Sequence, residues 1–140
     1  MADSKKVYLT SSVFLAFIDR ADPKHEQASA FFRFFGEEEY MLYTDIGSIT
    51  QTCTTIYKDI SPSLARDFLR TMTLTDINII YPEEADFKGA VKALVNYGST
   101  NLSFPDALIA VLADKRDISQ VSTFDYFHAL FGQTLFFLPL

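Results

Sequence analysis

Several polar and acidic side chains follow the short runs that are predicted to form strands. Thr10, Asp45 and Asp125 each stand at or just beyond the end of such a run. In open parallel sheets, ligands bind where loops leave the carboxyl ends of the strands. Gln51 and Asp106 lie on predicted helices, and adding them gives a polar cluster near the same ends. The sequence therefore predicts a polar, partly acidic ligand site at this edge of the sheet.

The cysteine and the two histidines of the sequence do not form a pattern that predicts nucleophilic catalysis. Cys53 falls on the apolar side of a predicted helix, which favours core packing over a catalytic thiol. As the single cysteine, it also excludes an internal disulfide. His25 and His128 are isolated, and neither pairs with a serine or cysteine at a recognisable spacing. We expect both histidines on the surface or in turns.

Short β-prone runs alternate with helical segments along the chain. β-branched and aromatic runs predict strands, and apolar residues at spacings of three and four predict helices. The predicted strands cover residues 7–9, 41–43, 77–81, 120–123 and 135–138. The predicted helices cover residues 13–18, 23–36, 46–60, 62–70, 83–97 and 104–113, with a loop or short helix over 124–131. This alternation predicts βαβ units and a mostly parallel central sheet between helical layers, an α/β class.

Capping residues predict where several of these helices begin and end. Thr10 and Ser11 offer hydroxyl groups for the start of the first helix. Asp22 followed by Pro23 predicts the N-cap and the first turn of the second helix. Gly98 is expected to end the helix over residues 83–97.

Length and composition limit the class of protein. A chain of 140 residues with 49% apolar and 21% charged residues is an ordinary globular mixture, and we expect one domain over residues 1–140. No apolar run approaches the roughly 20 residues that span a bilayer, so no membrane segment is expected. The first nine residues are too short and too polar for a signal peptide. We therefore expect a cytoplasmic protein.

The charge and the aromatic content indicate what kinds of partner the protein could have. A net charge of −6 argues against a protein that holds nucleic acid by bulk electrostatics, because phosphate binding needs a basic surface. Any RNA contact should therefore be local. Fourteen phenylalanines and seven tyrosines are more than a small core is expected to hide. This excess predicts a homo-oligomeric surface and favours a homodimer.

Three segments and the ending of the chain together resemble the landmarks of a known family. The segments are residues 8–13 (YLTSSV), 102–107 (LSFPDA) and 122–127 (STFDYF), and the ending is residues 138–140 (LPL). In order and spacing they are similar to those of VapC-type PIN domains, which belong to the PIN family of metal-dependent ribonucleases (VapC-like toxin or PilT N-terminus type). The resemblance runs from about residue 6 to residue 140 and implies a three-layer α/β/α PIN-like fold.

The resemblance implies a metal site of four acidic residues that hold Mg²⁺ or Mn²⁺, because hard cations prefer carboxylate oxygens. By position, the third and fourth acids fall on Asp106 and Asp125, which are retained. The first falls on Thr10 and the second on Gln51, so half of the set has lost its charge. Both replacements still offer neutral oxygens. We therefore expect weak binding of Mg²⁺ or Mn²⁺ by Asp106 and Asp125, and weak activation of water.

Each acidic candidate also has a structural interpretation. Ser103 and Asp106 fit a capping box, in which each side chain accepts from a backbone N–H at the helix start, and that role is compatible with metal binding. Asp125 could equally be a turn residue that binds its own backbone. Asp45 could replace a lost acid in space, or it could be a first-turn acid favoured by the helix dipole.

Three functions follow from this combination of a family pattern and a reduced acidic set. The favoured one is a PIN-domain protein of weak or absent activity that serves as an RNA-binding or protein-interaction module. The alternative is an active Mg²⁺- or Mn²⁺-dependent VapC-like endoribonuclease on single-stranded RNA. A pure interaction protein, either a homodimer or the partner of an antitoxin-like polypeptide, is compatible with both.

Overall fold

Five parallel strands form the centre of the molecule. The computed structural model describes residues 5–97 and 101–139. The described strands are β1 (Lys6–Leu9), β2 (Met41–Asp45), β3 (Asn78–Ile80), β4 (Gln120–Ser122) and β5 (Thr134–Leu135), and their order in the sheet is β3-β2-β1-β4-β5. All four strand pairings are parallel. Parallel strands point their carboxyl ends the same way, so the loops that follow them gather at one edge.

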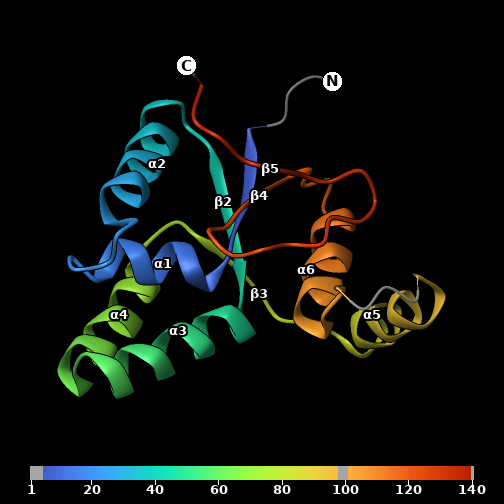
Figure 1. Ribbon diagram of the computed structural model, residues 1–140, viewed down its shortest axis with the longest axis horizontal. Coiled ribbons are helices and arrows are strands. Elements are labelled where there is room, and N and C mark those ends of the chain that lie inside the picture. Colours follow the sequence, from blue (N-terminus) through green and yellow to red (C-terminus); the bar gives the residue numbers. More distant parts are fainter. Residues whose placement is uncertain (1–4, 98–100, 140) are drawn as a thin grey trace.

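Helices cover both faces of this sheet (Figure 1). One face packs against four helices: α1 (Ser11–Ile18), α2 (His25–Glu37), α3 (Ile46–Asp59) and α4 (Pro62–Leu74). The other face packs against α5 (Glu84–Tyr97) and α6 (Phe104–Asp114). This arrangement confirms the predicted three-layer α/β/α fold.

The central strand β1 shows how the sequence specifies two buried faces. Val7 and Leu9 belong to the apolar cluster under α1 to α4, whereas Tyr8 belongs to the cluster under α5 and α6. All three side chains are fully buried. Successive strand residues point to opposite faces, so a strand covered on both sides needs an uninterrupted apolar run. The run at residues 7–9 meets that need.

Several predicted boundaries are wrong by a few residues. The second helix begins at His25, because Asp22 instead accepts a hydrogen bond from the backbone N–H of Lys24 at 2.7 Å in a tight turn before the helix. The fourth helix continues to Leu74, beyond the predicted residue 70. The last strand is Thr134–Leu135 and not 135–138.

Other local predictions have mixed outcomes. The segment over residues 124–131 contains no helix and is a loop. Cys53 is partly buried against the cluster under α1 to α4, as predicted for a packing residue. Gly98, expected to end α5, and Leu140 lie outside the described residues. Within the part of the chain that the structure describes, no helix is both long and apolar enough to cross a membrane.

Candidate functional site

A cavity of about 330 Å³ brings the predicted site residues together. Thr10, Gln51, Asp106 and Asp125 all line it, and Asp45 lines it as well. Three of these residues stand at or just after the carboxyl ends of strands β1, β2 and β4, and the others come from α3 and α6. We call this cavity the polar cleft. The geometry agrees with the predicted cluster, while the chemical role of each side chain remains a proposal.

Thr10 lies between β1 and α1, where it is the N-cap residue of the helix. Its side chain makes no capping hydrogen bond, which differs from the predicted role. The hydroxyl Oγ1 instead donates to the carbonyl of Ser122 at 3.3 Å and shares a 3.1 Å hydrogen bond with Ser12 Oγ. Thr10 therefore fastens the end of β1 to the end of β4.

A chain of hydroxyl groups continues from Thr10 to the loop that carries Asp125. Ser12 Oγ lies 3.1 Å from Thr123 Oγ1 and accepts a hydrogen bond from the backbone N–H of Phe124 at 2.9 Å. Thr123 Oγ1 in turn accepts from the backbone N–H of Asp125 at 3.2 Å. These bonds hold the backbone of Asp125 beside the polar cleft, and its exposed side chain is left to solvent or ligand.

Asp106 lies in the first turn of α6 and is half-buried. Its backbone N–H donates to Ser103 Oγ at 3.2 Å, which is one half of the predicted capping box. Its carboxylate oxygen Oδ2 accepts from the backbone N–H of His128 at 3.3 Å, so the side chain also ties α6 to the loop after β4. Burial raises the pKa of Asp106, the nearby charge of Asp125 acts in the same direction, and the His128 contact partly offsets both.

Asp45 has both carboxylate oxygens engaged within the protein and is only 4% exposed. Oδ1 accepts from the backbone N–H of Ser48 at 2.8 Å, as an N-cap residue does. Oδ2 accepts from Ser48 Oγ at 2.9 Å and from the hydroxyl of Tyr8 at 2.6 Å. Burial and the adjacent carboxylate raise the pKa of Tyr8, which keeps it a proton donor. Asp45 is therefore the cap of α3, and hydrogen bonds within the protein occupy most of the acceptor sites of its carboxylate.

The donor set of the polar cleft fits a divalent cation only in part. Within residues 5–97 and 101–139, no group of three or more His, Cys, Asp or Glu side chains is close enough together to hold a metal ion. Asp106 and Asp125 supply the available carboxylates, and Thr10 and Gln51 supply neutral oxygens. Mg²⁺ can be held through one or two carboxylates when waters and substrate phosphates complete its shell. The affinity for an ion held this way depends strongly on whether the substrate is bound.

The polar cleft also has an apolar wall, which the sequence pattern does not predict. The wall consists of Phe104, Pro105, Leu108, Ile109 and Phe127. Of the described side chains that line the cleft, none is a lysine or arginine. The spacing in residues 102–109 points to a buried helix, and only the tertiary structure shows that its first turn opens onto the cleft.

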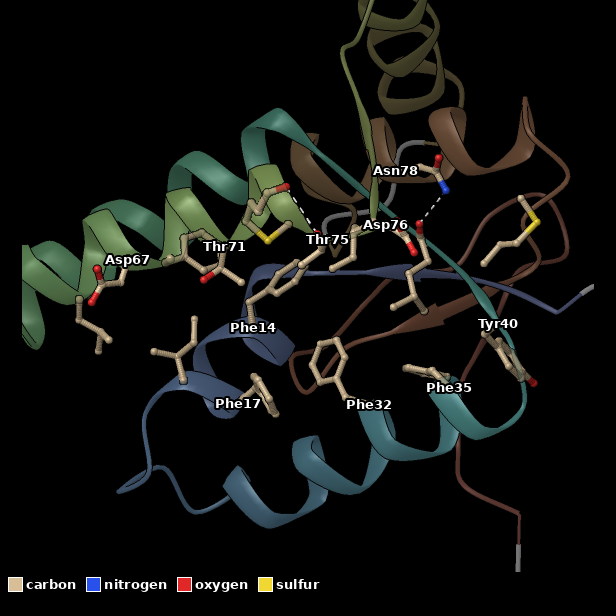
Figure 2. A pocket seen from close by; sticks show the side chains of 18 residues that line it. Phe14, Phe17, Phe32, Phe35, Tyr40, Asp67, Thr71, Thr75, Asp76 and Asn78 are labelled. Atoms are coloured by element: carbon tan, nitrogen blue, oxygen red, sulfur yellow. Dashed lines mark hydrogen bonds between the residues drawn. The ribbon is translucent and has the colours of Figure 1, made fainter.

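A second cavity of about 690 Å³ is lined by residues of α1, α2, α4 and the segment leading to β3 (Figure 2). Aromatic side chains from α1 and α2 form one wall, including Phe17, Phe32 and Phe35. The opposite wall comes from α4 and the segment leading to β3, where polar side chains such as Thr71 and Asp76 are found. We call this cavity the apolar groove. Several of the many aromatic side chains of the sequence therefore line a groove.

Comparisons with known proteins agree with this architecture. The family model described as PIN domain matches residues 7–129. Among solved structures, the VapC20 toxin of Mycobacterium tuberculosis, described as cleaving the sarcin-ricin loop, superposes with a TM-score of 0.75. The two are 18% identical, and the match covers 85% of this chain and 89% of the toxin. No curated protein sequence matches. On the extent of the family match, the chain belongs to the PIN domain family.

Proposed function

We propose that this PIN-domain protein has weak or no ribonuclease activity and serves as an RNA-binding or protein-interaction module. The observation that carries the proposal is the state of the carboxylates in the polar cleft. By the resemblance to the family pattern, Thr10 and Gln51 stand where acids are expected, and Asp45 makes three hydrogen bonds within the protein, as the cap of α3 and as the acceptor for Tyr8. Asp106 and Asp125 are therefore the lining carboxylates least engaged within the protein, and two such groups balance the charge of a divalent ion less well than four.

Single-stranded RNA would have to be bound without help from basic side chains. The polar cleft has hydroxyl and amide groups that can donate hydrogen bonds, and its apolar wall contains Phe104, whose ring is partly exposed. Aromatic rings stack on bases regardless of sequence. These features support local contacts with unpaired bases in place of phosphate binding by a basic surface.

The test compares the natural protein with a variant in which both acids are restored. We expect the natural protein to bind Mn²⁺ weakly in calorimetry and to leave a labelled single-stranded RNA uncut. Thr10→Asp combined with Gln51→Glu should tighten Mn²⁺ binding, because two carboxylates are added to the same cleft. Tight binding of Mn²⁺ by the natural protein would contradict the proposal.

An active Mg²⁺- or Mn²⁺-dependent endoribonuclease is the second candidate. It is favoured because Asp106 and Asp125 line the same cleft. Their carboxylates could bind a divalent ion whose remaining coordination positions are filled by water and substrate phosphates. A bound ion of this kind would activate water and stabilise charge on the phosphate. Metal-dependent cleavage that disappears in Asp106→Ala, with the fold retained by circular dichroism, would establish this candidate. Absence of product at high protein and metal concentration would exclude it.

We propose, as the protein-interaction part of this function, that a protein partner binds in the apolar groove. An antitoxin-like polypeptide with an apolar face could cover the rings of Phe17, Phe32 and Phe35. We also propose that the protein forms a homodimer, because large apolar side chains remain exposed outside the groove as well, including Phe87, Val95 and Tyr126. Multi-angle light scattering over a range of concentrations measures this directly.

A further inference from the structure

Two of the hydroxyl groups that line the polar cleft already donate hydrogen bonds within the protein. Thr10 Oγ1 donates to the carbonyl of Ser122 at 3.3 Å, and Ser48 Oγ donates to Asp45 Oδ2 at 2.9 Å. A hydroxyl group carries a single hydrogen. While these bonds persist, Thr10 and Ser48 therefore have no hydrogen left to donate to a ligand.

The side-chain amide of Gln51 is available to a ligand. Gln51 lies on α3, is exposed and lines the polar cleft. Its amide makes no hydrogen bond within the part of the chain that the structure describes. A glutamine amide presents a carbonyl oxygen and an NH₂ group side by side. It can therefore bind the edge of a base that offers a donor next to an acceptor.

Carboxylates make the remaining polar surface of the cleft rich in acceptors. The carboxylate of Asp125 is exposed and accepts no hydrogen bond from the described residues. Asp106 Oδ2 accepts from the backbone N–H of His128 at the long distance of 3.3 Å, so its carboxylate keeps acceptor capacity. No lysine or arginine is among the described lining residues. The cleft therefore favours a ligand that donates hydrogen bonds and disfavours the oxygens of a phosphate.

Among the bases of RNA, adenine matches this combination of groups. Its N6 amine lies beside the N7 acceptor, and a glutamine amide binds this edge with two hydrogen bonds. The amine hydrogen that glutamine does not bind is then free to be donated to a carboxylate. Uracil carries a carbonyl oxygen in place of an amine, and that oxygen would face the carboxylates of the cleft. Cytosine has an amine that a carboxylate can bind, but it lacks the second ring of a purine.

The ring of Phe104 adds a stacking surface to the same cleft. It is 37% exposed and lines the cleft beside Asp106 in the first turn of α6. A purine presents more ring area to such a surface than a pyrimidine does. We propose that the polar cleft recognises adenine in single-stranded RNA, where Gln51 binds the base edge and Asp106 and Asp125 accept from the amine. The proposal rests on the RNA binding put forward above and adds the base that is recognised.

The first test compares strands of one base each. Fluorescence anisotropy measures the binding of labelled strands of about ten nucleotides, made of adenosine, cytidine or uridine, with EDTA present so that no divalent ion occupies the carboxylates. We expect the adenosine strand to bind at least about tenfold more tightly than the uridine strand, with the cytidine strand between them. A strand of purine riboside, which keeps the two rings and lacks the amine, should lose most of this preference.

The second test changes the side chains that are assigned to the base. Gln51→Met removes the amide and keeps the length of the side chain, so the ratio of the adenosine to the uridine affinity should fall to within about threefold. Gln27→Met is the matched control and should keep the full ratio, because Gln27 is an exposed glutamine on α2 that does not line the cleft. Asp125→Asn should raise the affinity for the uridine strand, because an amide can donate to a carbonyl oxygen.

The outcomes separate adenine recognition from RNA binding. Equal affinities of the natural protein for the adenosine and uridine strands would overturn adenine recognition while RNA binding stands. A preference that survives in Gln51→Met, with circular dichroism showing a folded variant, would overturn the role of Gln51. Free adenosine that binds as tightly as the strand would overturn RNA as the source of the base. Binding of no strand at all would overturn the RNA-binding function itself.

Discussion

Tyr8 and Asp45 show how one buried pair shapes the polar cleft. The hydroxyl of Tyr8 on the central strand donates to the carboxylate of Asp45, the N-cap of α3, at 2.6 Å. A hydrogen bond to a charged acceptor in a buried place is stronger than one between neutral groups. The pair holds Asp45 in a structural role, so Asp106 and Asp125 are the cleft carboxylates with the fewest hydrogen bonds within the described structure.

We predict that Tyr8→Phe lowers the free energy of unfolding by about 1.5–3 kcal/mol, the range for a hydrogen bond to a charged group. The ring still fills its place in the core, so the loss reports the hydroxyl alone. Chemical denaturation measures the change. Tyr43→Phe is the control, because the neighbouring Tyr43 side chain packs on the same core and makes no hydrogen bond within the described structure. Equal losses in both variants would mean that the Asp45 contact contributes nothing.

Asp86 is the other buried carboxylate with a defined structural role. Its Oδ2 accepts from the backbone N–H of Glu83 at 2.8 Å, and its Oδ1 pairs with Lys115 at 2.9 Å. The hydrogen bond from Glu83 is the main cause that lowers the pKa of Asp86, and Lys115 adds to it. Asp86 thereby joins the start of α5 to the end of α6.

At the scale of elements, Asp86 is expected to make the α5–α6 pair sensitive to acid. A lowered pKa means that Asp86 stabilises the fold above the ordinary carboxyl pKa and that this stabilisation is lost as the pH falls through the lowered value. We predict that Asp86→Asn costs about 1 kcal/mol at neutral pH. The difference between the variant and the natural protein should shrink as the pH falls below 4, roughly the carboxyl reference value.

Denaturation at several pH values measures the Asp86 effect. Asp67→Asn is the matched control, because Asp67 forms an exposed pair with Arg70 on α4 and such pairs contribute little. A constant difference between Asp86→Asn and the natural protein at all pH values would show that the carboxylate charge is not responsible.

The strand-to-helix junctions decide which polar groups face the polar cleft. Strand β2 runs directly into α3 at Asp45, and a single residue, Thr10, separates β1 from α1. Residues at such junctions serve the helix start and the ligand site at once. That double use explains why the predicted capping roles of Thr10 and Asp106 are each only partly right. Besides a local partner, each has one hydrogen-bond partner on β4 or the loop after it, far away in sequence.

The described surface of the whole molecule gives a prediction for RNA binding. No lysine or arginine is among the described residues of the polar cleft, and the chain carries a net charge of −6. Few counterions would therefore be released when single-stranded RNA binds, and the affinity should depend weakly on salt. We expect a loss of less than about tenfold between 50 and 200 mM salt, whereas six to ten phosphate contacts cost roughly 10³- to 10⁵-fold.

Fluorescence anisotropy with a short labelled RNA measures the salt dependence. Phe104→Leu should weaken binding severalfold at both salt concentrations, since one stacked base is worth about 1–3 kcal/mol. Phe137→Leu is the control, because Phe137 is exposed and lies outside the polar cleft. A steep fall in affinity with salt would indicate a basic binding surface elsewhere on the molecule.

The sequence by itself determined the layered architecture and the membership of the polar cleft. Apolar runs such as residues 7–9 specify a strand buried on both faces, because side chains alternate with a period of two. Thr10 and Asp125 could be grouped because parallel strands bring their carboxyl ends to one edge. Gln51 and Asp106 lie on helices and joined the group through the resemblance to the family pattern.

Only the tertiary structure decided how those residues are used. The hydrogen bond that Asp45 Oδ2 accepts from Tyr8 joins residues 37 positions apart in the chain, which the local cap from Ser48 does not predict. The opening of the apolar groove and the outward direction of Phe87 depend on how far neighbouring helices stand apart. Helical periodicity tells which residues share a face, but it does not tell whether the face meets the core, a partner or solvent. Contacts between segments far apart in the sequence decide what a helix face packs against, and a local sequence pattern does not specify those contacts.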